Sequence, residues 1–323
     1  MDRFLNRRSA LLILFAAIAC LIALADRTPL HYDKYLPHPK VEEDFNYFWR
    51  GVTDQTLPGP SVYRVLVPYL ILALQLTTPL NPITIDLILK IALLVACQLV
   101  FFEYLSSFIA RPASLTGVLL LDCAIAFALA YIMGPSTVET SALLDVVVFT
   151  LALMAISTNR FLILCVVLGI GMLNRETPFL LLPILFLNDR SGNRGWLRSA
   201  VVLLVVALPY FGLRLFIETS GEPIWVTFYG IKYNVPFVSS QYLSSAIAAN
   251  VHVGLMLAPL IIIGLYRFRE HPFFLRIASY VAPLYIVFMY TFGTIIEARL
   301  WLPLLVLLIP LAVDSLQMLL SRD

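Results

Sequence analysis

The sequence predicts an all-α protein, a polytopic bundle of transmembrane helices that forms one domain over residues 1–323. Hydrophobic residues make up 60% of the chain and charged residues only 13%, whereas a soluble domain carries about 25% charge. The mean hydropathy is +0.89. The apolar residues also gather into repeated runs close to the length of about 20 residues that a helix needs to cross a bilayer.

About ten of these runs are predicted to span the membrane. They lie near residues 9–25, 83–109, 113–133, 141–157, 161–173, 177–188, 197–216, 251–266, 275–293 and 299–318. The first run follows several arginines and resembles a secretory signal, but the many later runs favour an uncleaved first helix. A further apolar stretch, 62–76, is interrupted by Arg64 and Pro68.

Arginine clusters indicate the orientation, because cytoplasmic loops carry the excess of Lys and Arg. With ten spans, the main clusters all lie inside only if the stretch 62–76 does not cross. We therefore expect residues 26–82 to form an outer loop with interfacial or re-entrant helices. Both termini are then cytoplasmic, and a bacterial inner membrane is the expected location. The main clusters are Arg3/Arg7/Arg8, Arg190/Arg194/Arg198 and Arg267/Arg269/Arg276.

This threading gathers the polar patches of the chain on the outer side of the membrane. Polar groups are costly in a bilayer, so charges kept at the edges of apolar segments are the main evidence for function. Segments far apart in the sequence thus converge on one face, as in a site that is built at a membrane surface on a helical scaffold. The patches are residues 26–61, 134–140, 174–177, 217–250 and 297–299.

The outer loop contains the candidate catalytic acid, Asp44. It begins the aromatic-rich run Asp44–Arg50, and aromatic rings favour the headgroup level. A carboxylate at the start of such a helix faces the positive end of the helix dipole, which keeps it ionised, and an ionised carboxylate can deprotonate an acceptor. Glu42 and Glu43 compete for this role. A capping or solvated acidic cluster explains the same residues equally well.

Arginines at three segment edges are candidate phosphate contacts, because a guanidinium offers a planar fork of donors. Arg64 follows Tyr63 at the start of an apolar helix, and Arg175 divides two apolar stretches. Arg299 follows Glu297 before the final span. An interface anchor or a structural ion pair is the alternative explanation in each case. The break around Arg175 reads Asn174-Arg175-Glu176-Thr177-Pro178.

Other polar residues are weaker candidates. Glu139 belongs to the outer side and could line the site, and Asp145 lies about one turn deeper and could join the same network. Asp122 is expected to find a partner on a neighbouring helix. The histidines and cysteines lack the spacing of metal ligands, so no metal site is predicted.

Several function classes lack support in the sequence. There is no basic tract of the kind that binds nucleic acid. A P-loop, a dinucleotide fingerprint, an HExxH motif and a GxSxG motif are also missing. A soluble nucleotide is therefore not expected as the immediate substrate.

The order of these segments resembles the GT-C superfamily of integral-membrane glycosyltransferases, which use polyprenyl-phosphate-linked sugars as donors. The resemblance rests on four segments, and it implies that Asp44, with Glu43 beside it, takes the place of the catalytic acid of the first outer loop. It also implies that Arg64, Arg175 and Arg299 contact the lipid-linked phosphate. The segments are Asp44-Phe45, Tyr63-Arg64-Val65-Leu66-Val67-Pro68, Asn174-Arg175-Glu176-Thr177-Pro178 and Glu297-Ala298-Arg299-Leu300-Trp301-Leu302-Pro303.

The resemblance implies sugar transfer to an acceptor at the non-cytoplasmic face, with membrane lipids around the donor. Arginines would hold the phosphate charge as it leaves, and a divalent metal is compatible with this chemistry but is not required by it. A transporter or flippase of a lipid-linked or anionic solute is the first alternative. It predicts charges near the midplane and a repeat between halves, and no convincing repeat is present. The second alternative is a non-catalytic subunit whose outer face docks a partner subunit.

Overall fold

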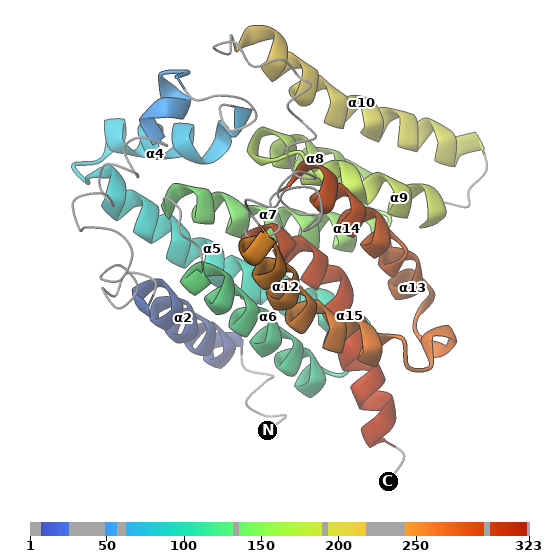
Figure 1. The fold of residues 1–323 in the computed structure, drawn as a ribbon. Coiled ribbons are helices and arrows are strands. Elements are labelled where there is room, and N and C mark those ends of the chain that lie inside the picture. Colours follow the sequence, from blue (N-terminus) through green and yellow to red (C-terminus); the bar gives the residue numbers. More distant parts are fainter. Residues whose placement is uncertain are drawn as a thin grey trace.

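The structure is a computed structural model that describes residues 8–25, 49–56, 63–131, 136–188, 193–217, 243–293 and 298–321. Every regular element in these ranges is a helix, which confirms the all-α prediction. Figure 1 shows the helices packed side by side in a bundle. They are α2 (Arg8–Ala25), α4 (Leu66–Thr77), α5 (Pro82–Ser106), α6 (Arg111–Tyr131), α7 (Ser136–Ser157), α8 (Phe161–Asn174), η3 (Thr177–Leu181), α9 (Leu182–Asn188), α10 (Asn193–Phe216), α12 (Leu243–Gly264), η6 (Phe268–Glu270), α13 (Phe273–Ser279), α14 (Val281–Phe292), η7 (Ala298–Trp301) and α15 (Leu302–Leu320).

Among the described residues, six helices are long and apolar enough to cross a membrane. The prediction of a protein with several membrane-spanning helices is therefore confirmed, while the number of about ten spans stays a prediction. Further apolar helices are shorter, at 10–17 residues, and they include α8 and the η3–α9 segment. The six long segments are Pro82–Ser106, Arg111–Leu129, Thr140–Ser157, Gly195–Phe216, Phe273–Phe292 and Arg299–Leu320.

Helices α7 and α15 lie at the centre of the bundle. In each of them 78% of the apolar window is buried, compared with 17% in α10. Helix α7 packs against α5 and α8, and α15 packs against α12 and α6. Helix α10 lies at the edge of the bundle, against α8 and α9 (Figure 1). An apolar helix with so little protein cover is suited to contact with lipid.

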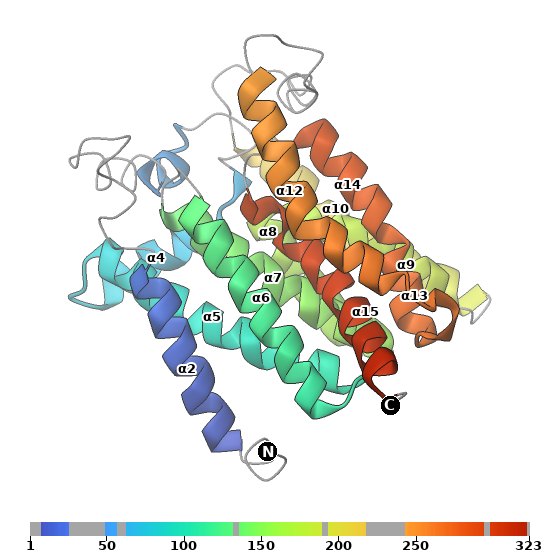
Figure 2. The same ribbon diagram turned by 60° about the horizontal axis from the view of Figure 1, so that its bottom comes forward.

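Helix α2 begins and α15 ends at the same end of the bundle, which we call the terminal end (Figure 2). The turn between α5 and α6 lies there too, because the Ala110 amide donates to Gln317 Oε1 near the end of α15, at 3.4 Å. Exposed arginines lie at this end too. They include Arg111 at the start of α6, Arg160 between α7 and α8, and Arg198 near the start of α10. We call the opposite end, where α15 begins, the site end.

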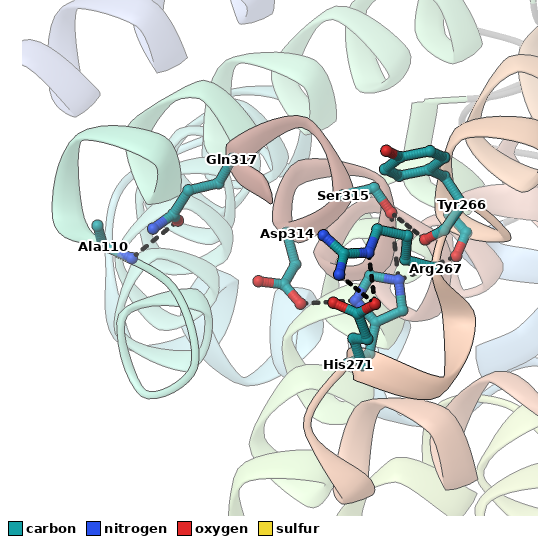
Figure 3. A network of polar contacts seen from close by, with 9 residues as sticks. Ala110, Tyr266, Arg267, His271, Asp314, Ser315 and Gln317 are labelled. Carbon is teal, nitrogen blue, oxygen red and sulfur yellow. Dashed lines mark hydrogen bonds and ion pairs between the residues drawn. The ribbon is translucent and has the colours of Figure 1, made fainter. Parts of the chain in front are cut away.

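A buried polar network joins the turn after α12 to α15 at the terminal end (Figure 3). His271 Nδ1 lies 2.6 Å from Asp314 Oδ2, and its Nε2 lies 3.1 Å from the Gly264 carbonyl oxygen. Ser315 Oγ lies 3.2 Å from the same Nε2 and donates to the Tyr266 carbonyl oxygen at 3.3 Å. The network holds the turn after α12 against α15. Because His271 is only 2% exposed, it is not accessible to a substrate.

Helix α4 and the short helical turn at residues 49–53 lie at the site end. Helix α4 has 12 residues, fewer than the about 20 that a crossing requires. It packs against α5, α7 and α8. The indole Nε1 of Trp49 donates to the Pro68 carbonyl oxygen at 3.2 Å, and this bond connects the short turn to α4.

Candidate functional site

The break after α8 is attached to α7 by buried hydrogen bonds. Ser141 Oγ donates to Asn174 Oδ1 at 2.8 Å, and Asn174 Nδ2 donates back to the Ser141 carbonyl oxygen at 2.8 Å. Further along α7, both oxygens of Asp145 accept from the Thr177 hydroxyl, at 2.6 and 2.7 Å. Ser141 and Asp145 share one face of the helix because they are four residues apart. The polar break in the sequence is thus held by one face of α7.

Arg175 and Arg64 both lie near Asp145. Arg175 is 3% exposed and Asp145 is 1% exposed. The charges of both arginines act on the Asp145 carboxylate, and Arg175 Nε also lies 3.4 Å from Ser141 Oγ. Away from water such charge interactions are stronger than at an exposed surface. Arg64 Nε is buried and makes no hydrogen bond within the described part of the chain.

A third guanidinium enters from the end of α10. Arg214 Nη2 forms an ion pair with Glu176 Oε1 at 3.0 Å. Its Cζ lies 3.7 Å from the centre of the Tyr210 ring and 4.4 Å from the centre of the Tyr63 ring. Arg214 was not among the site residues predicted from the sequence. The available signal was a single cation near the end of the apolar run 197–216.

Arg299 enters from a short helix, η7, that contacts α7. It is 8% exposed and belongs to η7, immediately before α15. The next residue, Leu300, accepts a hydrogen bond from Tyr285 through its carbonyl oxygen at 2.6 Å. The charges of Asp145 and Arg175 act on the hydroxyl of Tyr285. Tyr285 therefore joins α14 to the start of α15 by a hydrogen bond, and its hydroxyl lies near the two buried charges.

Two further buried charges on α5 were not predicted. Asp86 and Lys90 are both fully buried, with 0% exposure. Thr140 Oγ1 donates to Asp86 Oδ1 at 2.7 Å, and Thr140 directly precedes Ser141 on α7. The α5 charges thus adjoin the same turn of α7 that holds the break. The sequence does contain an indication of this pair, because an acid and a base lie four residues apart inside the predicted span 83–109.

The structure brings together most of the predicted site residues that it describes. Tyr63, Arg64, Asn174, Arg175 and Glu176 contact one another or share partners, and Asp145 joins them as the sequence suggested.

The remaining candidates keep their roles as predictions. Glu43, Asp44 and Glu297 lie outside the described residues, and Glu139 lies in α7 without a described side chain. Within the described ranges, no group of three or more His, Cys, Asp or Glu could hold a metal ion.

Positive charge exceeds negative charge in the described part of the cluster. The carboxylates of Asp145 and Glu176 accompany a larger number of guanidinium groups, while Asp86 and Lys90 balance each other. Buried charge is costly unless opposite charge compensates it, and guanidinium groups bind phosphate oxygens in a bidentate manner. The cluster can therefore accommodate an anion. Its guanidinium groups are those of Arg64, Arg175, Arg214 and Arg299.

Comparison with known proteins adds no assignment, since no protein-family model, curated protein or solved structure matches the chain.

Proposed function

We propose that the protein is a membrane glycosyltransferase of the GT-C type, which moves a sugar from a polyprenyl-phosphate donor to an acceptor at the non-cytoplasmic face. The observation that carries the proposal is that the buried Arg175 and the partly buried Arg64 both lie near one carboxylate, Asp145, at one end of an apolar bundle. A lipid-linked phosphate presents an anion at the membrane surface, and its chain remains among apolar helices. Arginines at the end of an apolar bundle suit the chemistry of both parts of such a donor.

In the proposed reaction, the acceptor oxygen or nitrogen attacks the anomeric carbon of the donor sugar. The bond between that carbon and the phosphate oxygen breaks, and the phosphate leaves with the electron pair. Arg64 and Arg175, with Arg299 beside them, stabilise the charge that develops on this phosphate. Asp44, with Glu43 next to it, takes the acceptor proton.

Asp145 has a different role in this proposal. Both of its oxygens accept from the Thr177 hydroxyl, and only 1% of the residue is exposed. It is therefore badly placed to receive a proton from an acceptor that arrives from water. Its charge instead orients Arg64 and Arg175 and reduces the cost of burying them.

The proposed topology has about ten spans, with both termini cytoplasmic in a bacterial inner membrane. Two features support it. Helix α2 begins and α15 ends at the same end of the bundle, and exposed arginines such as Arg111 and Arg160 lie at that end. The site end would then be non-cytoplasmic, and residues 26–82 would form interfacial or re-entrant helices there, as the length of α4 allows.

Sugar transfer from a labelled polyprenyl-phosphate donor by the purified protein tests the proposal. We expect Asp44→Asn to abolish transfer while leaving donor binding intact, and Arg175→Ala to weaken donor binding. Arg198→Ala, at an exposed arginine of the terminal end, is the matched control. Thermal unfolding of each variant separates loss of function from loss of fold. Full activity in both Asp44→Asn and Arg175→Ala would remove the assigned mechanism.

A transporter or flippase is the second candidate, because Asp86 and Lys90 are charges buried inside a membrane-spanning helix and such charges also serve transport. Proteoliposomes distinguish the two functions. Movement of a labelled polyprenyl-phosphate lipid between leaflets, without transfer of its sugar to any acceptor, would favour transport.

A further inference from the structure

We infer that Arg214 is a positioning residue, which clamps the segment carrying Tyr63 and Arg64 to the break after α8. The clamp thereby fixes where the Arg64 guanidinium lies relative to Arg175. This inference rests on the proposed binding of a lipid phosphate at the same site. It assigns a role to a residue that the proposed reaction does not use.

The clamp lies at the end of the least buried span. Only 17% of the apolar window of α10 is buried, so most of this helix has little protein to hold it. Its last turn is different. Arg214 pairs with Glu176 at 3.0 Å, and Ile217 packs against Val52, as Tyr63 and Val65 also do. The end of an otherwise peripheral helix is thus attached to two separate parts of the site.

The geometry of the clamp requires an arginine. The Arg214 Cζ lies over the Tyr210 ring, 3.7 Å from its centre, and over the Tyr63 ring, 4.4 Å from its centre. The guanidinium edge donates to the Glu176 carboxylate at 3.0 Å and to the Tyr210 carbonyl oxygen at 3.2 Å. A planar group can stack through its faces and donate through its edge at the same time. A lysine ammonium would keep the charge but lose the stacked arrangement.

The clamp acts on the anion site through Tyr63. Tyr63 directly precedes Arg64, so a fixed Tyr63 ring fixes the backbone from which the Arg64 side chain extends. The Arg64 charge acts on Asp145 together with that of Arg175, and Arg64 Nε has no hydrogen-bond partner among the described residues. Two arginines can bind the same anion only if their guanidinium groups are held at a suitable, fixed distance from each other. Without the clamp, Arg64 would lose this alignment.

Affinity for a polyprenyl monophosphate, which carries no sugar to transfer, measures the functional consequence. We expect Arg214→Lys to weaken the affinity by about tenfold, because it removes the stacking. Tyr63→Leu removes the ring on which Arg214 lies and should resemble Arg214→Lys. Arg198→Lys, on the same helix but at the terminal end, is the control and should change the affinity by less than about twofold.

The rate of maleimide labelling at Val65→Cys measures the clamp without any ligand. Val65 is partly buried against Val52, so we expect slow labelling with Arg214 present and several-fold faster labelling with Arg214→Gln. Labelling and affinity that are both unchanged in the Arg214 variants would overturn the clamp. Faster labelling in a protein that binds no polyprenyl phosphate even when unmodified would support the clamp and overturn the proposed function instead.

Discussion

Replacement of Gly171 by alanine should disrupt the packing of the end of α8 against α7 and destabilise the protein. A Cβ atom at Gly171 would lie 2.5 Å from Val148 Cγ1 and 3.0 Å from Pro178 Cγ. Carbon atoms pack at about 3.5–4.0 Å, so α7 would have to move by about 1 Å. Such overpacking costs about 1–3 kcal/mol. Alanine recovers roughly 0.5–1 kcal/mol of helix preference, which leaves an expected net loss of about 0–2.5 kcal/mol.

Gly212→Ala is the matched control, because a Cβ atom there meets nothing within 4 Å. It should leave stability unchanged or raise it by about 0.5–1 kcal/mol through the same helix preference. Reversible unfolding of both variants in one detergent measures the difference between them. If Gly171→Ala were as stable as Gly212→Ala, the close approach of α7 and α8, on which the site geometry depends, would be wrong.

Three other polar side chains, at Tyr104, Tyr285 and Asp314, yield stability predictions. The Tyr104 hydroxyl is buried with no hydrogen-bond partner in the described ranges, so Tyr104→Phe should stabilise the protein by up to about 1–3 kcal/mol. Tyr285→Phe should destabilise the protein by about the same amount, because the Tyr285 hydroxyl donates to the Leu300 carbonyl oxygen. Thermal unfolding of the Tyr104→Phe and Tyr285→Phe variants measures both effects. Asp314→Ala removes the hydrogen-bond partner of His271 Nδ1. A double-mutant cycle with His271→Ala should give a coupling free energy of about 0.5–3 kcal/mol. Additive effects of the two substitutions on stability would contradict the contact.

The helical class and several spans could be predicted because lipid imposes one simple constraint, a long apolar run with its backbone satisfied internally. The predicted run 83–109 corresponds to α5, Pro82–Ser106. The start of α5 also has a local signature, since Asn81 accepts the Thr84 amide at 2.8 Å and Pro82 suits the first turn. Asp122 has the helix partner that was expected for it, Gln98 Nε2, at 3.0 Å.

The number of spans could not be obtained in the same way, because hydropathy does not distinguish a helix that crosses from one that stops part of the way. The predicted runs 161–173 and 177–188 correspond to α8 and to the η3–α9 segment, both shorter than a usual crossing. Their ends are set by the tertiary bonds of Asn174 and Thr177 to α7. Sequence period and composition carry no information about such partners.

The site residues divide by chemistry in a way that the sequence does not show. The neutral groups of Asn174 and Thr177 are occupied by α7, so they hold the break in place and have little capacity left for a ligand. The guanidinium groups of Arg64 and Arg175 share one buried carboxylate, Asp145, so their combined charge exceeds that of their acidic partner. In the short polar break, neutral residues at positions 174 and 177 thus hold the segment to α7, and the charged residues lie between them. Function at this end of the bundle should consequently depend on the charged members, and stability on the neutral ones.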